Sequence, residues 1–519
     1  MSTQSISNKD DVSLEKGVRC KGMLKRAQKL CIDTKKIKNN LLQKTVPKFG
    51  SHNATVYKYI TGKFYHPSTR FDDLRGLSIN KGGDCDLIQA NSKFIAVPIS
   101  GPGGRVAIIN ADKPGRLPTQ IPCIMCGSEV INFKFSPFDE SILVTVSNDN
   151  KIRVWSIPEG GIEEDVAEPK FILETRSMDK IHLLEFHPTT KDILLTTSDD
   201  LGNPTIRIWN LETQKDEITL SGIHKDVIFS CAWSPDGKQI ATTTKEKKIR
   251  VLDARTGNVI SEGPAHNSIR PSRLLWLSQE TGLLISVGFG LGSAREVLLL
   301  QKDNLTKPVA KNMIDVSPSV MSAYFDKDCQ ILFVAGRGDR TIHTFHVETD
   351  TQKLVPLAKI ESASLQQGFA FLPKRACNVK EIEIDKFYRL TPTHIEVVGV
   401  RVPRARPEYF QDDIFVPTPD IERPAQNAAS WFNGDDKQLE LISLQPEGMT
   451  ELSVAPPPPS QAQSKKKFEM GKQYVSDEQR KQEQMERMFK AAKNLPEPEV
   501  KPKNTNPEDE EVAEDEWDD

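Results

Sequence analysis

The stretch "FKFSPFDESILVTVSNDNKIRVW", Phe133 to Trp155, decides the fold because it returns twice further along the chain. The copies are "LEFHPTTKDILLTTSDDLGNPTIRIW", Leu184 to Trp209, and "CAWSPDGKQIATTTKEKKIRVLD", Cys231 to Asp253. In each copy, β-branched residues alternate with Ser and Thr between turn signals, which predicts the order strand, turn, strand, turn, strand. We expect each copy to form one small antiparallel sheet.

The spacing of the copies predicts how these sheets are arranged. Their turn prolines, Pro137, Pro188 and Pro235, lie 51 and 47 residues apart, slightly more than the period of about 40–45 typical of propeller blades. Weaker copies cover Phe94 to Asn110, Leu283 to Leu300 and Ile331 to Val347. With a closing blade shared by the two ends, the total is about seven. The sequence therefore predicts an all-β fold, a seven-bladed β-propeller.

The ends of the copies, "IRVW", "IRIW" and "IRVLD", resemble the end of a WD repeat. His224 and His266 precede two units at the place of the His in the Gly-His pair of that family. The resemblance implies a structural histidine in a hydrogen-bond network, and we prefer this role to a catalytic one.

Composition indicates polar ends attached to a globular body. Residues 1–50 hold 12 Lys/Arg against 4 Asp/Glu, whereas residues 496–519 hold 2 against 11. Such ends are usually interaction tails, and the basic one suits acidic lipid, nucleic acid or an acidic filament. No apolar run is long enough to span a bilayer or to form a signal core, and the scattered cysteines fit a reducing compartment.

The sequence after the repeats resembles the segment that follows the propeller in coronins. It contains "PKR" leading to "FYRL" (Pro373 to Leu390), "VPR" leading to "FQDD" (Val402 to Asp413), and "WFNG" before "ISL" (Trp431 to Leu444). The resemblance covers roughly Thr55 to Gly448 and is strongest to the long tandem-propeller coronins. It implies that aromatic side chains of this segment cover the open underside of the propeller, namely Phe387, Tyr388, Phe410 and Phe415.

We accordingly divide the chain into six parts. The first three are a basic tail, disordered or partly helical, at 1–46, the propeller at 47–375, and a coronin-type extension packed on it at 376–452. The last three, mostly disordered, are a Pro-rich linker at 453–475, an amphipathic helix at 476–495 and an acidic tail at 496–519.

The family resemblance implies that the basic surface of the propeller binds filamentous actin. The actin-contacting arginine of the first blade falls on Arg75 in "FDDLRGLS". The alternative is an ion pair with Asp72 or Asp73, because exposed pairs of this kind are common. Further candidates for the same basic face are Arg105, Lys113 and Arg116.

The C-terminal part predicts a second contact. Met485, Met488, Phe489 and Leu495 fall on one face of the predicted helix, and the chain ends in "EDEWDD", which includes Asp515, Glu516, Trp517 and Asp518. This arrangement resembles the segments by which Wiskott-Aldrich family activators engage the actin-related protein 2/3 complex. The acids would steer the tail to a basic surface, and the indole would anchor it.

The leading hypothesis is a non-enzymatic, cytoplasmic regulator of actin at the cell cortex, with the filament and the actin-related protein 2/3 complex as partners. The alternative is an adaptor in Golgi and vesicle trafficking. We expect no catalytic residues, cofactor, metal site or nucleic-acid partner, and "CIMC" (Cys123 to Cys126) is interpreted as two thiols in a strand or turn. Peripheral membrane contact stays open, and trimerisation is not expected because residues 476–494 lack sustained heptads.

Overall fold

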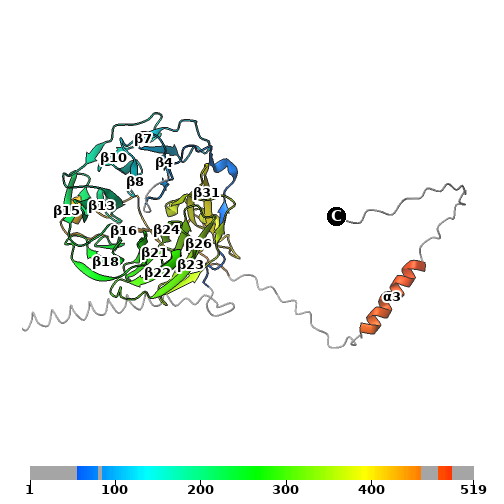
Figure 1. Cartoon of the computed structure of the whole chain (residues 1–519). Helices are drawn as coiled ribbons and strands as arrows, with labels where there is room; N and C mark the ends of the chain where they lie inside the picture. Colours follow the sequence, from blue (N-terminus) through cyan, green and yellow to red (C-terminus); the bar gives the residue numbers. More distant parts are fainter. Residues whose placement is uncertain (1–54, 80–84, 457–476, 494–519) are drawn as a thin grey trace, which may run out of the picture. The chain divides into compact units, whose positions relative to one another are not determined.

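The computed structural model describes residues 55–79, 85–456 and 477–493. The chain divides into two compact units, the first ending at Ala455 and the second beginning at Pro456, and each is described by itself. Seven of the sheets described in the first unit, of mainly antiparallel strands, are arranged in a ring as the blades of a propeller (Figure 1). The predicted all-β, seven-bladed fold is confirmed.

The first four blades each contain four strands in sheet order. The first blade is β3 (Gln89–Ala90), β4 (Phe94–Ile99), β5 (Arg105–Asn110) and β7 (Cys123–Met125). The second is β8 (Val130–Phe135), β9 (Ile142–Ser147), β10 (Ile152–Ser156) and β11 (Phe171–Leu173). The third is β12 (Ile181–Phe186), β13 (Ile193–Asp200), β14 (Asn203–Asn210) and β15 (Lys215–Leu220). The fourth is β16 (Ile228–Trp233), β17 (Gln239–Thr244), β18 (Lys248–Asp253) and β19 (Val259–Pro264).

The next three blades complete the ring. The fifth is β20 (Arg273–Ser278), β21 (Leu283–Phe289), β22 (Ala294–Gln301) and β23 (Ala310–Val316). The sixth is β24 (Met321–Asp326), β25 (Ile331–Gly336), β26 (Thr341–Glu348), β27 (Lys353–Pro356) and the short β28 (Ile360–Glu361). The seventh is β29 (Gly368–Phe371), β30 (Glu383–Leu390), β31 (His394–Arg401), β1 (Thr61–Phe64), β2 (Phe71–Asp72) and β6 (Gly115–Arg116). Short 3-10 turns cover Pro67–Thr69, Leu291–Ser293, Lys374–Ala376 and Val379–Glu381.

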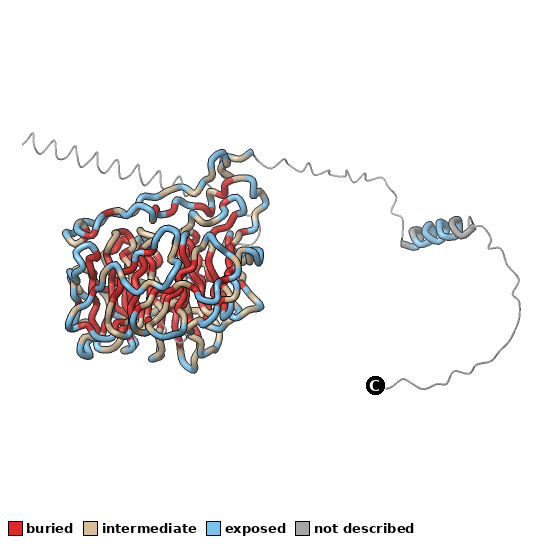
Figure 2. The backbone as a smooth tube through the Cα atoms, turned by 90° about the horizontal axis from the view of Figure 1, so that it is seen from above, coloured by how far each residue is buried: buried red, intermediate tan, exposed pale blue. Residues whose placement is uncertain are grey.

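The repeated motif shows why these segments form blades. Its prolines lie in the turn between the first two strands of a blade, where a missing N–H is harmless. The tryptophans that end two copies, Trp155 and Trp209, are buried, and each donates its indole N–H to a threonine of the preceding strand, Thr145 at 2.9 Å and Thr196 at 2.8 Å. The alternating threonines therefore satisfy polar atoms inside the blade. Figure 2 shows the buried residues concentrated in these strands.

The two predicted structural histidines are buried and hydrogen-bonded. His266 Nδ1 lies 2.9 Å from Glu296 Oε1, and His266 Nε2 lies 2.9 Å from Ser286 Oγ. His224 Nδ1 accepts a hydrogen bond from Arg250 Nη1 at 2.9 Å. Both side chains hold neighbouring strands together, as the WD-repeat resemblance implies.

The seventh blade joins the two ends of the folded body and corrects the predicted boundary at residue 375. β31 pairs with β30 on one side and with β1 and β2 on the other, so residues 383–401 belong to the propeller. Phe387 and Tyr388 consequently lie in the core of a blade and do not cover its underside. The predicted boundary was wrong because motif order along the chain does not reveal pairing between strands more than 300 residues apart.

The true extension starts after β31 and crosses the propeller. It contains the ribbon β32 (Thr418–Pro419) with β33 (Leu441–Ile442) and the helix α2 (Ala428–Phe432). Phe410 and Phe415 pack against strands of the sixth and seventh blades, as expected for aromatic residues that cover the propeller. Trp431 of α2 inserts among residues of the third and fourth blades and is fully buried.

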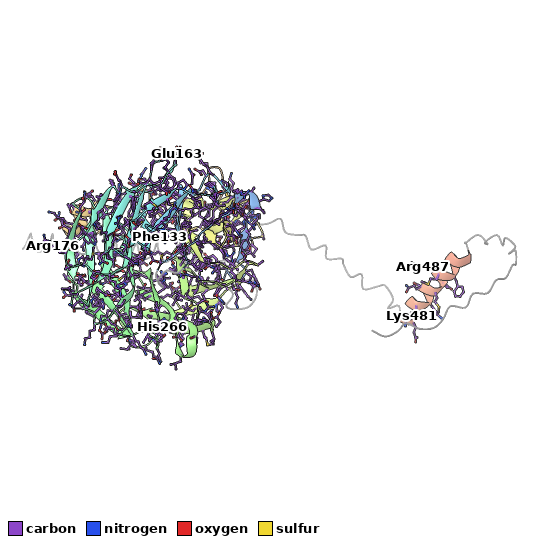
Figure 3. All side chains as sticks on the ribbon, turned by 45° about the horizontal axis from the view of Figure 1, so that its top comes forward. Phe133, Glu163, Arg176, His266, Lys481 and Arg487 are labelled. Atoms are coloured by element: carbon purple, nitrogen blue, oxygen red, sulfur yellow. The ribbon has the colours of Figure 1, made fainter. Side chains whose placement is uncertain are left out.

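The second unit contains the helix α3 (Asp477–Lys493). This matches the helix predicted for residues 476–495. Its described side chains are all exposed (Figure 2), and Lys481 and Arg487 project from its surface (Figure 3). The basic tail, most of the Pro-rich linker and the acidic tail lie outside the described residues.

Candidate functional site

Arg75 follows the closing strand β2 and is held by the carboxylate of Asp73. Arg75 Nε donates to Asp73 Oδ1 and Nη2 donates to Asp73 Oδ2, each at 2.8 Å. The hydrogen bonds from Arg75 are the main reason why the pKa of Asp73 lies below its usual value. The alternative role, an ion pair with a neighbouring aspartate, is thus present in the structure, yet 56% of the Arg75 side chain remains exposed.

Arg116 reaches the same carboxylate from another part of the chain. β6 lies parallel to β2, with Arg116 opposite Asp72. Arg116 Nε donates to Asp73 Oδ2 at 3.1 Å, and Nη2 lies 3.1 Å from the same oxygen. The side chain is 78% exposed. We call Arg75, Asp73 and Arg116 together the arginine fork.

The other two predicted basic residues do not join the fork. Arg105 begins β5 and is held by Asp165, with Nη2 2.9 Å from Oδ2. Lys113 lies between β5 and β6, three residues before Arg116, but no ion pair or side-chain hydrogen bond links it to Asp73 among the described residues. Two of the four predicted residues therefore meet at one place.

The predicted tail residues divide between described and undescribed parts. Met485, Met488 and Phe489 lie on α3 with exposed fractions of 59%, 67% and 71%. The others lie outside the described residues, namely Leu495, Asp515, Glu516, Trp517 and Asp518. The described part is an apolar helix face without a partner inside its own unit, as far as the described residues extend.

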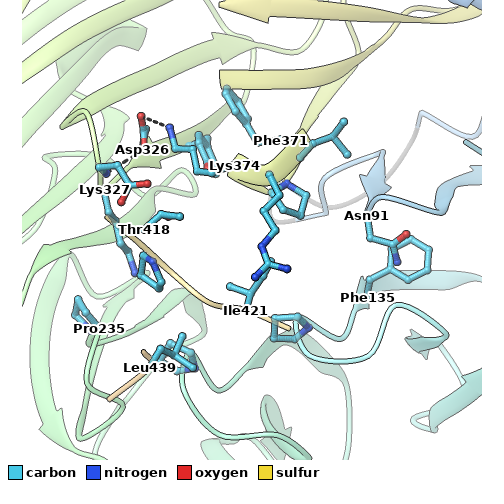
Figure 4. Close-up of a pocket in the computed structure, with 18 of the residues that line it drawn as sticks. Asn91, Phe135, Pro235, Asp326, Lys327, Phe371, Lys374, Thr418, Ile421 and Leu439 are labelled. Carbon is cyan, nitrogen blue, oxygen red and sulfur yellow. Dashed lines mark hydrogen bonds and ion pairs between the residues drawn. The ribbon is translucent and has the colours of Figure 1, made fainter. Parts of the chain in front are cut away.

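A pocket that the sequence analysis missed lies where the extension crosses the propeller (Figure 4). Its volume is about 680 Å³. Its lining includes the repeat prolines Pro137, Pro188 and Pro235 together with Thr418 and Leu441 of the β32–β33 ribbon. The three turn prolines and the "PKR" motif, which contains Lys374, are visible in the sequence, but nothing local shows that they line one pocket.

A buried ion cluster forms one wall of this pocket. Lys374 Nζ lies 2.6 Å from Asp326 Oδ2 and 3.0 Å from Asp385 Oδ1, and it donates to the Ile384 carbonyl at 2.7 Å. Burial alone would lower the pKa of Lys374, but the two carboxylates hold it well above its usual value. Burial followed by the charge of Asp326 raises the pKa of Asp385 well above normal. The cluster joins the sixth blade to the seventh.

Neither a metal centre nor a redox pair is assembled in the described parts of the chain. There, no three His, Cys, Asp or Glu side chains are arranged to hold a metal ion. Cys123 and Cys126 are free, buried thiols, and burial raises the pKa of Cys126 to about 11. Within the same residues, no helix has the length and hydropathy of a bilayer-spanning segment.

Family models match short parts of this chain. A WD domain, G-beta repeat, matches residues 217–253, a type of WD40 repeat matches residues 395–439, and a domain of unknown function (DUF1899) matches residues 52–116. The last of these matches contains the arginine fork.

Comparison with whole proteins decides the family. Coronin-2A of Homo sapiens is 32% identical over 405 residues, covering 76% of this chain and 75% of that protein. The chain belongs to the coronin family. Coronin-7 of Mus musculus is 36% identical over 472 residues, covering 90% of this chain but 50% of coronin-7. The chain thus spans about half the length of these longer relatives, which agrees with the predicted likeness to tandem-propeller coronins.

A solved structure agrees with this assignment. The crystal structure of the WD40 domain from Toxoplasma gondii coronin superposes with a TM-score of 0.68 at 26% sequence identity, covering 75% of this chain and 98% of that domain. Coronins are non-enzymatic WD40 propeller proteins, so the expected lack of enzymatic activity follows from the family.

Proposed function

We propose that this coronin-family chain binds actin filaments through the exposed arginine fork. The observation that supports the proposal is that Arg75 and Arg116 come from different segments and converge on one exposed edge of the propeller. A filament surface rich in carboxylates can accept hydrogen bonds from the exposed guanidinium groups. We place the chain in the cytoplasm, on actin at the cell cortex.

Filament co-sedimentation of the full chain tests this proposal. Arg75→Asp and Arg116→Asp should each weaken binding, and binding by the unaltered chain should fall as salt is raised, because the contact is electrostatic. Arg176→Asp is the matched control, since Arg176 is an exposed arginine between β11 and β12, outside the fork. If both fork variants bind as well as the control, the proposal is wrong.

We further propose that α3 and the acidic tail contact the actin-related protein 2/3 complex. The exposed apolar face of α3 supports this, because the free energy falls when a partner covers three large apolar side chains that otherwise lie in water. Deletion of residues 509–519 should abolish pull-down of the complex and leave filament co-sedimentation intact. Unchanged pull-down would contradict this assignment.

The second candidate function, an adaptor in Golgi and vesicle trafficking, is supported by the pocket between the propeller and the extension. Its largely apolar lining of prolines, Phe135 and Phe371 suits an extended peptide. Imaging of the tagged full chain separates the candidates. Cortical, actin-rich edges favour filament regulation, whereas perinuclear puncta favour the adaptor.

A further inference from the structure

One carboxylate holds both arginines of the fork. Among the described residues, Asp73 Oδ1 accepts a hydrogen bond from Arg75, and Asp73 Oδ2 accepts from both Arg75 and Arg116. We propose that Asp73 is a positioning residue that presents Arg75 and Arg116 as a two-armed receptor for paired carboxylates on an acidic protein surface. This inference rests on the proposed function of filament binding.

The hydrogen bonds to Asp73 leave other donors of both arms unused among the described residues. Each arginine uses Nε and Nη2 for Asp73, and the described residues provide no hydrogen-bond partner for Nη1 of either arginine. A guanidinium group donates five hydrogen bonds in one plane, so a group fixed along one edge still offers the other. Each arm can therefore meet a carboxylate while Asp73 keeps its own contacts.

The backbone around Asp73 fixes the position of the fork. Asp73 has φ of 64°, a left-handed conformation that turns the chain sharply after β2. Leu74 N donates to the Thr393 carbonyl at 2.8 Å, and Leu117 N donates to the Asp72 carbonyl at 2.9 Å. The segments that carry both arms are thereby tied to the seventh blade. Donors that are already oriented lose little conformational freedom when a partner binds.

Removing the charge of Asp73 distinguishes between a positioning role of Asp73 and simple electrostatic attraction of the fork to the filament. Asp73→Asn removes the negative charge, and simple attraction to an acidic filament would then strengthen binding. Positioning predicts weaker binding, because the uncharged amide holds two guanidinium groups poorly and the long side chains become free to move. Asn tolerates positive φ well, so the turn itself should persist.

Asp72 provides a matched control one residue away. It lies opposite Arg116 in the β2–β6 pairing and is exposed, and no side-chain ion pair or hydrogen bond links it to a described residue. Asp72→Asn therefore changes the net charge at the same place without removing the support of the fork.

The test is filament co-sedimentation of the full chain, Asp72→Asn and Asp73→Asn at two salt concentrations, with thermal melting as a check of folding. We expect Asp73→Asn to raise the Kd by about fivefold or more, and Asp72→Asn to leave it unchanged or lower it. We also expect Arg116→Gln to weaken filament binding when it is introduced into the unaltered chain. Introduced into the Asp73→Asn variant, it should weaken filament binding little further, because the two residues act together.

Each other outcome contradicts one part of the proposal. If both aspartate variants bind more tightly, or if neither changes binding, Asp73 is not a positioning residue and the proposed function stands. If Arg116→Gln weakens filament binding by the same factor in the unaltered chain and in the Asp73→Asn variant, the fork does not act as one unit. If the unaltered chain does not sediment with filaments, the proposed function fails and this inference fails with it.

Discussion

Replacement of Trp431 tests how the extension is fastened to the propeller. The side chain is fully buried, its Nε1 donates to the Gly237 carbonyl at 3.2 Å, and its ring lies 5.9 Å from that of Trp233. Arg255 covers it, with the guanidinium carbon 4.4 Å from the ring centroid, and Arg255 Nη2 also donates to the Trp431 carbonyl at 2.9 Å. Trp431→Ala removes all the ring contacts and leaves a cavity.

The expected loss follows from burial. A tryptophan buries about 200 Å². At about 25 cal/mol per Å² this corresponds to about 5 kcal/mol as an upper value. Measured replacements of buried aromatic residues by alanine cost about 3–5 kcal/mol. We therefore expect Trp431→Ala to lower the free energy of unfolding by about 4 kcal/mol. Trp431→Phe keeps most of the apolar area and loses the hydrogen bond, so we expect about 1–2 kcal/mol.

The assay is urea unfolding of the full chain followed by circular dichroism, together with limited proteolysis of the native state. The alanine variant should unfold at lower urea and should be cut within residues 402–455 at a protease concentration that leaves the unaltered chain intact. A loss below about 1 kcal/mol with an unchanged proteolysis pattern would refute the reasoning, because the extension would then be held without this side chain.

Three further predictions concern other sites. Lys374→Met leaves Asp326 and Asp385 buried without their cation and should cost about 3–5 kcal/mol at pH 7 in urea unfolding. The loss should shrink as the pH is lowered, because burial raises the pKa of Asp385 and its protonation removes one uncompensated charge. Burial lowers the pKa of His187 from 6.5 to about 3, so between these values the unfolded state binds the additional proton. The contribution of neutral His187 to the free energy of unfolding should therefore be fully present above pH 6.5. Toward pH 3 the free energy of unfolding should fall by at most about 1.4 kcal/mol per pH unit, and His187→Gln should reduce this slope. Phe489→Ala should weaken pull-down of the actin-related protein 2/3 complex without changing the melting temperature, because the side chain is exposed on α3.

The candidate site could be predicted in part. Arg75 was found through a motif, and its ion pair with a nearby aspartate was anticipated because the two residues are close in sequence. The convergence of Arg116 on the same carboxylate depends on the parallel pairing of β6 with β2, which no local pattern indicates. The Lys374 cluster was missed for a similar reason, since its carboxylates come from two different blades.

The sequence by itself determined the blade and its repetition. Alternation within a strand and a proline turn are local properties, so three good copies were enough to predict the propeller. The structural roles of His224 and His266 followed from the resemblance to WD repeats. The helix at the second unit followed from a pattern of the same local kind. The tertiary structure alone decided where the ring closes, which placed β30 and β31 in the seventh blade, and which charges share a partner. Ring closure and the shared ion pairs depend on backbone hydrogen bonds between segments that are distant in sequence. Such pairings stabilise the protein only once the chain has folded, so no local pattern predicts them.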